Sequence, residues 1–111
     1  MSDNVLHHLF TGFVRLHVLY HADKESICGV ELMEELRHHG YDVGPGTLYP
    51  ILHHLHEEGY LSCKKAVLRG KRRNNFRITA AGKKLLARAR TQLRELVSEV
   101  LKDRDQRKVR R

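Results

Sequence analysis

The chain has 111 residues, and 21 Lys and Arg against 13 Asp and Glu give it a formal net charge of +8 at neutral pH. This length allows one small domain, which we expect to gain stability from self-association, and the charge favours a polyanionic partner. No stretch approaches the roughly 20 apolar residues of a membrane helix and no signal-peptide pattern is present, so we expect a cytoplasmic protein without a membrane partner.

The first predicted element is a helix that follows capping candidates in residues 2–4 and runs to about Tyr20. Its apolar residues recur at helical spacing, but they occupy more of the circumference than one packing surface needs. We therefore expect one face to pack in the domain core. Another face, which includes Leu6, Phe10 and Phe13, is expected to contact a second copy of the chain.

A second helix is predicted over about residues 29–39, with Gly40 as its C-terminal cap and residues 40–44 as a turn. Its apolar positions recur every three or four residues, as a helix with one buried face requires. The residues expected to be buried are Val30, Leu32, Met33 and Leu36.

A third helix is predicted to open within residues 44–47 and to continue to Gly59. Its start is open to two interpretations: Pro45 is the first helical residue and Pro50 distorts the first turn, or Thr47 is the true cap. The residues expected to be buried are Leu48, Ile51, Leu52 and Leu55. Thr47, Tyr49 and His53 then lie on the open face, which makes this helix the candidate reader of a DNA groove.

Residues 60–67 and 75–79 are predicted as two strands joined by a basic loop over 68–74. This hairpin opens a region with twelve cations and no acid before Glu95. A basic hairpin after a helix-turn-helix is typical of a DNA-binding wing. The cations are Lys64, Lys65, Arg69, Lys71, Arg72, Arg73, Arg77, Lys83, Lys84, Arg88, Arg90 and Arg94.

The last helix is predicted to start near Thr79, whose hydroxyl can cap it. Its apolar residues alternate at spacings of three and four, as in a coiled coil, and its own domain offers little to cover them. We expect these residues to pack against a second copy; they are Leu86, Ala89, Leu93, Leu96 and Val100.

These elements predict a mainly α fold with a small β-hairpin, namely a winged helix-turn-helix with a long C-terminal helix. We expect a DNA-binding domain over residues 1–79 with its wing at about 60–79, a dimerisation helix over 80–103, and a frayed basic tail over 104–111.

Nine histidines and two cysteines raise the question of a metal site. His17 and His21 lie one helical turn apart, but the chain has no His-Glu-x-x-His motif and no Cys/His quartet. We therefore predict no metal and no cofactor, with a structural or sensing metal as the alternative. Cys28 and Cys63 are expected to be free thiols. Neither a catalytic triad, a phosphate-binding glycine loop nor paired carboxylates can be assembled, so the chain is not expected to be an enzyme.

Two motifs resemble the PadR family of bacterial transcriptional regulators, and the similarity runs from about residue 5 to 103. The first is Gly46-Thr47-Leu48-Tyr49-Pro50-x-Leu52-x-x-Leu55-x-x-x-Gly59-x-Leu61, and the second is Arg72/Arg73-Asn74-x-Phe76-x-Ile78-Thr79-x-x-Gly82. The chain departs from the family pattern in two places. It has Cys28-Gly29-Val30-Glu31-Leu32 where His-Gly-Tyr-Glu-Leu is common at the start of the second helix, and Phe76 where a tyrosine is common in the wing.

The resemblance implies a member of the short subgroup, which has a single C-terminal helix. Such proteins form homodimers through the first and last helices, bind inverted-repeat operators in double-stranded DNA and usually repress transcription. Some release DNA when an aromatic or drug-like molecule binds, so the resemblance also implies a small-molecule effector. Phe10, Phe13 and Tyr20 could then line a pocket at the dimer interface with Leu93, Leu96 and Val97.

We hypothesise that Tyr49 and His53 reach base edges or phosphates, and that Thr47 donates to a phosphate. Arg72 and Arg73 would enter or flank the minor groove. The residues expected to hold the DNA backbone are Lys64, Lys65, Lys71 and Arg77. Two alternatives remain open: Tyr49 is only a packing residue, or the domain is an interaction module whose basic hairpin binds RNA or an acidic protein.

Overall fold

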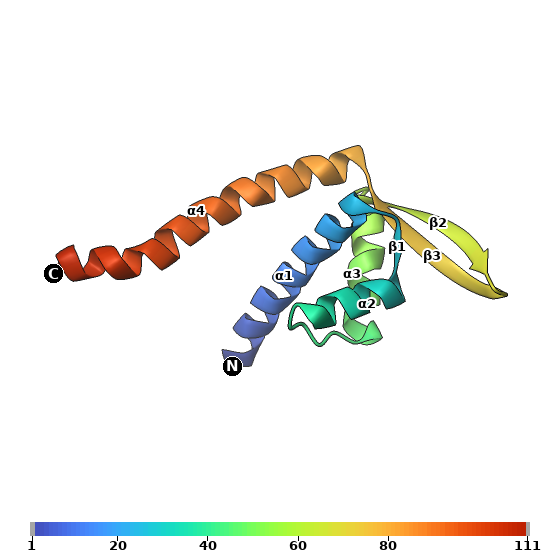
Figure 1. Ribbon diagram of the computed structural model, residues 1–111, viewed down its shortest axis with the longest axis horizontal. Coiled ribbons are helices and arrows are strands. Elements are labelled where there is room, and N and C mark those ends of the chain that lie inside the picture. Colours follow the sequence, from blue (N-terminus) through green and yellow to red (C-terminus); the bar gives the residue numbers. More distant parts are fainter. Residues whose placement is uncertain (1, 111) are drawn as a thin grey trace.

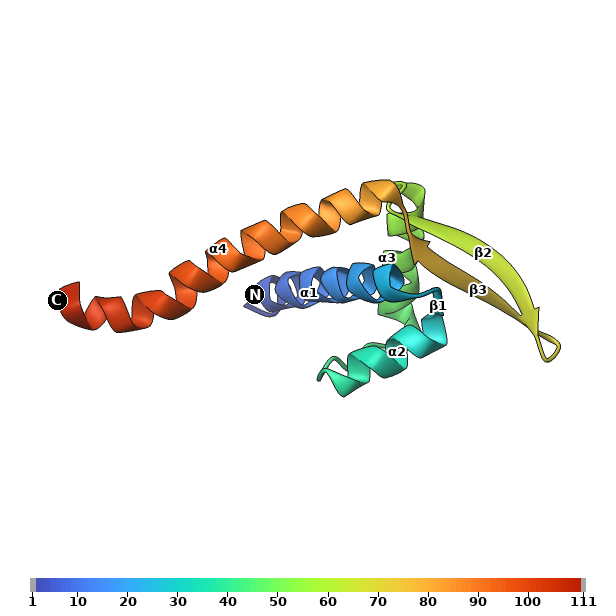
Figure 2. The same ribbon diagram turned by 45° about the horizontal axis from the view of Figure 1, so that its top comes forward.

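The computed structural model describes the backbone of residues 2–110 and the side chains of residues 4–102, and in this part the chain forms four helices and three strands. In chain order they are α1 (Ser2–Lys24), β1 (Ile27–Cys28), α2 (Gly29–His38), α3 (Pro45–Glu57), β2 (Leu61–Leu68), β3 (Lys71–Ile78) and α4 (Ala80–Arg110). Both views show the wing of β2 and β3 projecting from one side of the α1–α3 unit, while α4 extends to the other side (Figures 1 and 2). None of the described helices combines the length and the apolar character that crossing a membrane requires.

The core lies where α1, α2 and α3 meet the base of the sheet. Its members are Val14, Val18, Leu19, Ala22, Ile27, Leu32, Leu36, Val43, Leu48, Ile51, Leu52, Leu55, Leu61, Phe76, Ile78 and Leu86. All four residues predicted for the buried face of α3 belong to it. The prediction for α2 was wrong at Val30, which is 56% exposed. Val30 is the second residue of α2, and it lines a surface groove with residues of the wing and with Tyr49 instead of joining the core.

Pro45 is the first residue of α3, and Gly44 is its N-terminal cap, with an extended backbone (φ −92°, ψ 173°). A residue before proline is restricted to extended conformations, and the fixed φ of proline suits the first helical position. Thr47 therefore lies inside the helix and is not its cap. Pro50 is tolerated on the exposed side of α3, where water can solvate the carbonyl that lacks a partner.

The tip of the wing differs from the predicted seven-residue loop, because the strands are joined by only Arg69 and Gly70. Both have positive φ (54° and 77°), as a two-residue type I′ hairpin turn requires. Residues 71–74 consequently belong to β3, and Leu68 pairs with Lys71. The cluster of basic side chains suggested a loop. Gly70 at the second turn position instead allows the two strands to be joined by a tight turn.

A third strand, β1, was not predicted. It pairs antiparallel with β3, with Ile27 opposite Phe76 and Cys28 opposite Asn75, so the sheet order is β1-β3-β2. The hairpin is thus part of a three-stranded sheet. This pairing attaches the base of the wing to the junction between α1 and α2.

Thr79 caps α4, as predicted. Its Oγ1 accepts a hydrogen bond from the Gly82 N–H (3.0 Å) and donates one to the Gly59 carbonyl (2.6 Å). Gly82 is buried, and a Cβ at this position would lie 2.2 Å from the Tyr60 carbonyl oxygen. The end of α3 and the start of α4 can approach this closely only because residue 82 has no side chain. The tail 104–111 lies outside the residues whose side chains are described, so its fraying stays a prediction.

We predict that Gly82→Ala lowers the free energy of unfolding by about 1–3 kcal/mol, because the added methyl group collides with backbone that has no room to move. The intrinsic helix preference of alanine acts in the opposite direction. Urea denaturation measures the difference. Gly12→Ala in α1 is the matched control, since a Cβ there meets nothing within 4 Å; equal stability of the two variants would contradict the prediction.

Candidate nucleic-acid interface

The four buried residues of α3 fix its rotation and leave its predicted contact residues outward. Thr47 is half-buried, Tyr49 is 44% exposed and His53 is exposed. His53 Nε2 lies 3.3 Å from a carboxylate oxygen of Glu57, one turn later. Glu57 therefore restrains the imidazole, and it places negative charge at the end of the face that would read DNA.

Tyr49 lies directly against the first residue of α2. A Cβ on Gly29 would be 2.6 Å from the ring atom Cε1 and 2.8 Å from the hydroxyl oxygen of Tyr49. The glycine therefore lets the ring rest on the backbone of α2. The Tyr49 ring thus packs on Gly29, and nearly half of the residue stays accessible, so its contact with DNA stays a prediction.

A groove of about 370 Å³ connects this tyrosine with the wing. We call it the Tyr49 groove; it is lined by Cys28, Gly29, Val30, Tyr49, Lys71, Arg72, Arg73 and Asn74. One wall is the start of α2, where backbone N–H groups favour anions, and the other is the basic strand β3. The groove therefore presents cations, helix-end amides and a tyrosine hydroxyl together, which suits a phosphate of a nucleic-acid backbone.

Arg72 and Arg73 both line the Tyr49 groove, although successive residues of a strand start from its opposite faces and the two differ in burial. Arg72 is exposed. Arg73 is half-buried, and its Nη1 donates to the Cys28 sulfur at 3.6 Å. This contact ties the Arg73 guanidinium to the start of α2.

The other wing cations predicted to contact DNA, Lys64, Lys65, Lys71 and Arg77, are also exposed. Among the described side chains, Lys83 is the one cation of the block from Lys64 to Arg94 that meets a carboxylate, that of Asp23 at 3.8 Å. Among residues 4–102, whose side chains are described, no carboxylate therefore neutralises the positive charge of the wing. Such a surface attracts a polyanion and binds it in a salt-dependent manner.

Known proteins resemble this chain in sequence and in the fold that brings α3, the start of α2 and the basic hairpin together. Residues 18–88 match the sequence profile of the transcriptional regulator PadR-like family. The chain is 47% identical over 88 residues to Transcriptional regulator Rv3488 of Mycobacterium tuberculosis, covering 79% of this chain and 82% of that protein. The chain belongs to the PadR-like family of transcriptional regulators.

Other PadR-related proteins agree in fold. A PadR family regulator from Eggerthella lenta superposes with a TM-score of 0.79 at 27% identity, covering 91% of this chain and 89% of that one. A PadR-like transcription factor from Bacteroides fragilis gives 0.78 at 25% identity, covering 88% and 96%. A second sequence relative, Transcriptional activator GvpE1 of Halobacterium salinarum, is 34% identical over 71 residues, covering 59% of this chain and 37% of that protein. Family membership makes the protein a DNA-binding transcriptional regulator, and its relatives are regulators rather than enzymes.

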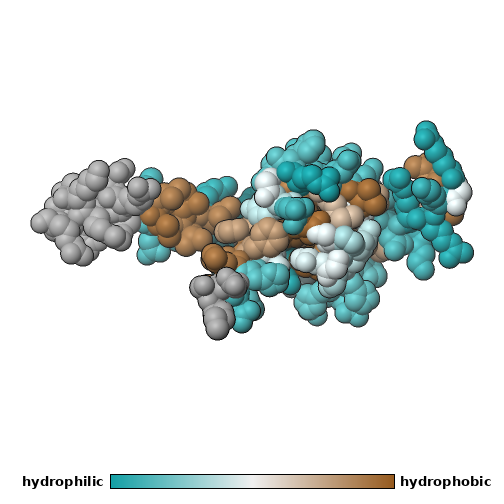
Figure 3. All heavy atoms as spheres, turned by 90° about the horizontal axis from the view of Figure 1, so that it is seen from below, coloured by the Kyte–Doolittle hydropathy of each residue, from teal (hydrophilic) through white to brown (hydrophobic). Residues whose placement is uncertain are grey.

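The residues predicted for dimer contacts fall into two groups in this PadR protein. Leu86 is buried in the protomer's own core, and Phe10 is half-buried with its ring 5.5 Å from that of Tyr41. The others are exposed: Leu6 and Phe13 on α1, and Leu93, Leu96 and Val100 on α4. Figure 3 shows apolar side chains gathered between the wing-bearing body and the C-terminal end of α4.

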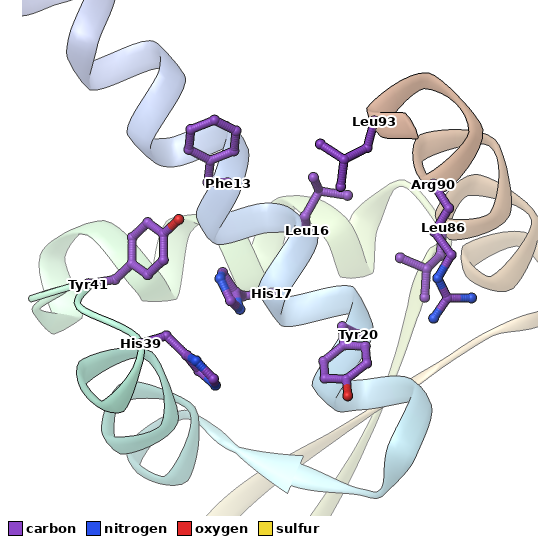
Figure 4. A pocket seen from close by; sticks show the side chains of 9 residues that line it. All are labelled: Phe13, Leu16, His17, Tyr20, His39, Tyr41, Leu86, Arg90 and Leu93. Carbon is purple, nitrogen blue, oxygen red and sulfur yellow. The ribbon is translucent and has the colours of Figure 1, made fainter. Parts of the chain in front are cut away.

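A second groove, of about 340 Å³, lies along α1 beside α4. We call it the α1–α4 groove; Figure 4 shows its lining, Phe13, Leu16, His17, Tyr20, His39, Tyr41, Leu86, Arg90 and Leu93. The His17 ring meets the Tyr41 ring edge-on at 4.8 Å and stacks on His39 at 5.2 Å. Burial, together with the neighbouring His39 and His21, lowers the pKa of His17, so its imidazole is neutral at pH 7. Aromatic walls with one arginine suit a flat molecule that carries a negative group.

We predict that Gly29→Ala moves the Tyr49 ring off α2 and lowers affinity for a specific DNA duplex about tenfold, while the free energy of unfolding stays within about 1 kcal/mol of wild type. The ring can swing away because only its far end meets the methyl group. Fluorescence anisotropy and urea denaturation measure the two quantities.

A double-mutant cycle separates this effect from general damage. In the Tyr49→Ala background the added methyl group has no ring to displace, so Gly29→Ala should lower affinity no further. Additive losses would show that Gly29 acts independently of Tyr49.

Proposed function

We propose that this PadR protein is a homodimeric repressor that binds an inverted-repeat operator in double-stranded DNA and is released from it by a small aromatic molecule. The observation that carries the proposal is the Tyr49 groove, where the outward face of α3, the start of α2 and the unneutralised strand β3 converge. A helix in the major groove with a basic hairpin beside it matches the docking of helix-turn-helix proteins on DNA.

In this arrangement Tyr49 and His53 contact base edges or phosphates of the major groove, and Thr47 donates to a phosphate. The His53 imidazole lies beside the Glu57 carboxylate, so the protein exchanges this contact for one with DNA when it binds. Arg72 reaches into or beside the minor groove, whereas Arg73 holds a phosphate next to α2. The side chains of Lys64, Lys65, Lys71 and Arg77 contact the DNA backbone.

Dimerisation is supported by the exposed apolar residues of α1 and α4. They lie on two helices that diverge from a common corner, and beyond Arg90 all described residues of α4 are exposed (Figure 1). The set is Val5, Leu6, Leu9, Phe13, Leu93, Leu96, Val97, Val100 and Leu101. Two-fold pairing of these faces would cover them and present two α3 helices to successive half-sites.

The α1–α4 groove supports a small-molecule effector. Its volume is in the range of ligand sites, and Arg90 stands near aromatic side chains that can stack on a ring. Because Phe13 and Leu93 belong both to this groove and to the exposed apolar set, a bound molecule would alter the packing of the two copies.

Selection of bound sequences from a random pool of duplexes tests the DNA-binding proposal. We expect one palindromic site whose half-sites lie about one helical turn, roughly 34 Å, apart. On that site, Arg72→Ala should weaken binding and reduce the slope of log affinity against log salt by about one. Lys83→Ala is the matched control, because Lys83 already pairs with Asp23. A protein without preference for any duplex would instead be a docking module for RNA or an acidic protein.

We predict that Leu93→Glu combined with Leu96→Glu converts the dimer to a monomer, since two charges would have to be buried between copies. Light scattering after size-exclusion chromatography measures the molar mass. Val67→Glu on the wing is the control, because Val67 is equally apolar and 70% exposed but lies far from α4. A double variant that stays dimeric would place the interface elsewhere.

A further inference from the structure

Three potential metal ligands from α1 and the end of α2 meet in a crevice beside the α1–α4 groove. They are His21 of α1, Glu35 of α2 and His39, which caps α2, and we call them the histidine cluster. One ligand atom of each lies within 4.8 Å of the other two. The adjoining cavity measures about 310 Å³, and the cluster residues line it with Tyr20, Lys24, Glu25 and Ile27.

His21 is the unusual member. It is only 9% exposed, and among the described residues no protein group forms a hydrogen bond with its Nε2. A buried polar nitrogen without a partner is unfavourable, because it has lost water and gained nothing in return. A ligand atom of a carboxylate and one of a second imidazole lie within 4.8 Å of a ligand atom of this buried side chain, so a bound cation could supply the missing interaction.

The donor set indicates the class of ligand. Two imidazole nitrogens and one carboxylate oxygen match the three protein ligands of zinc sites that leave a fourth position open, and imidazole disfavours Mg²⁺ and Ca²⁺. Glu35 and His39 are four residues apart, so they lie on the same side of α2 and face α1 together.

The cluster also has room to adjust. Tetrahedral coordination at Zn–N distances near 2.0–2.1 Å brings ligand atoms to about 3.3 Å from one another. His39 is exposed at the C-terminal cap of α2, so its side chain can rotate to close the remaining distance. Figure 4 shows its ring on the side of α2 that faces α1. His21 is buried on α1 and is therefore the more constrained of the two histidines.

We propose that His21, Glu35 and His39 bind one divalent transition-metal ion of the zinc class, with an open fourth position. The ion joins α1, which carries the exposed apolar face, to α2, which starts at the Tyr49 groove. It also fixes His39, which lines the α1–α4 groove. The proposal goes beyond DNA binding and does not depend on it.

The test uses full-length protein without a histidine tag, stripped with a chelator and then dialysed. Calorimetric titration with Zn²⁺ should show one ion bound per chain. Bound Co²⁺ should give the visible absorption bands of a low-coordinate site with nitrogen and oxygen ligands, and these bands should disappear when Zn²⁺ displaces the Co²⁺. Zn²⁺ should also raise the melting temperature of the wild type.

Glu35→Gln and His39→Ala should each weaken Zn²⁺ binding at least tenfold and abolish the rise in melting temperature. Both positions are accessible enough to be changed without disturbing the core, which circular dichroism verifies. His38→Ala is the matched control, because His38 is the exposed neighbour of His39 and lies outside the cluster. Absence of binding to the wild type, wild-type affinity in both cluster variants, or an equal loss in His38→Ala would overturn the proposal.

Discussion

The rotation of α3 about its own axis is the constraint on which the proposed DNA-binding surface depends. Leu48, Ile51, Leu52 and Leu55 are buried together, so the helix cannot turn without exposing one of them to water. This one rotation of α3 places Tyr49 against α2 and directs His53 toward solvent. Gly29 then decides how close α2 comes, because any side chain there would occupy the space of the Tyr49 ring. Reader helix and supporting helix are thereby fixed relative to one another before DNA is present.

Cys28 connects the wing to this unit in three ways. It pairs with Asn75 in the sheet, it precedes α2 as its N-terminal cap, and its sulfur accepts a hydrogen bond from Arg73. Its own N–H donates to Glu31 at 3.1 Å, which completes the start of the helix. A wing anchored at this residue keeps a defined distance between β3 and α3, as simultaneous contact with two DNA grooves requires. Closer to the tip, the strand pairing recorded for residues 71–74 is with β2 alone.

Features that depend on local periodicity and capping, such as the buried face of α3 and the Thr79 cap, could be predicted from the sequence. It did not predict β1, because two residues are too few to show the alternation of a strand. Val30 follows the helical period of α2, yet it lines a groove with residues of the wing, and only the three-dimensional arrangement reveals this. Likewise His21 and His39 lie 18 positions apart, on elements that meet only in the fold. Histidine spacing along the chain carries no signal for such a cluster.

Helix α1 contributes to the exposed apolar face, to the core and to the contact with α2, and an effector would have to couple these parts of the molecule. Its first half exposes Leu6 and Leu9, Val14 and Val18 pack in the core, and His17 and His21 face the end of α2. In a two-fold dimer joined through α1 and α4, the distance between the two α3 helices depends on the angle at which α1 meets α2. A molecule or ion bound between these helices changes DNA affinity only if it favours one such angle over another. If the protein binds half-sites at a fixed spacing, as proposed, its affinity for DNA would depend on that angle and hence on what is bound beside His39.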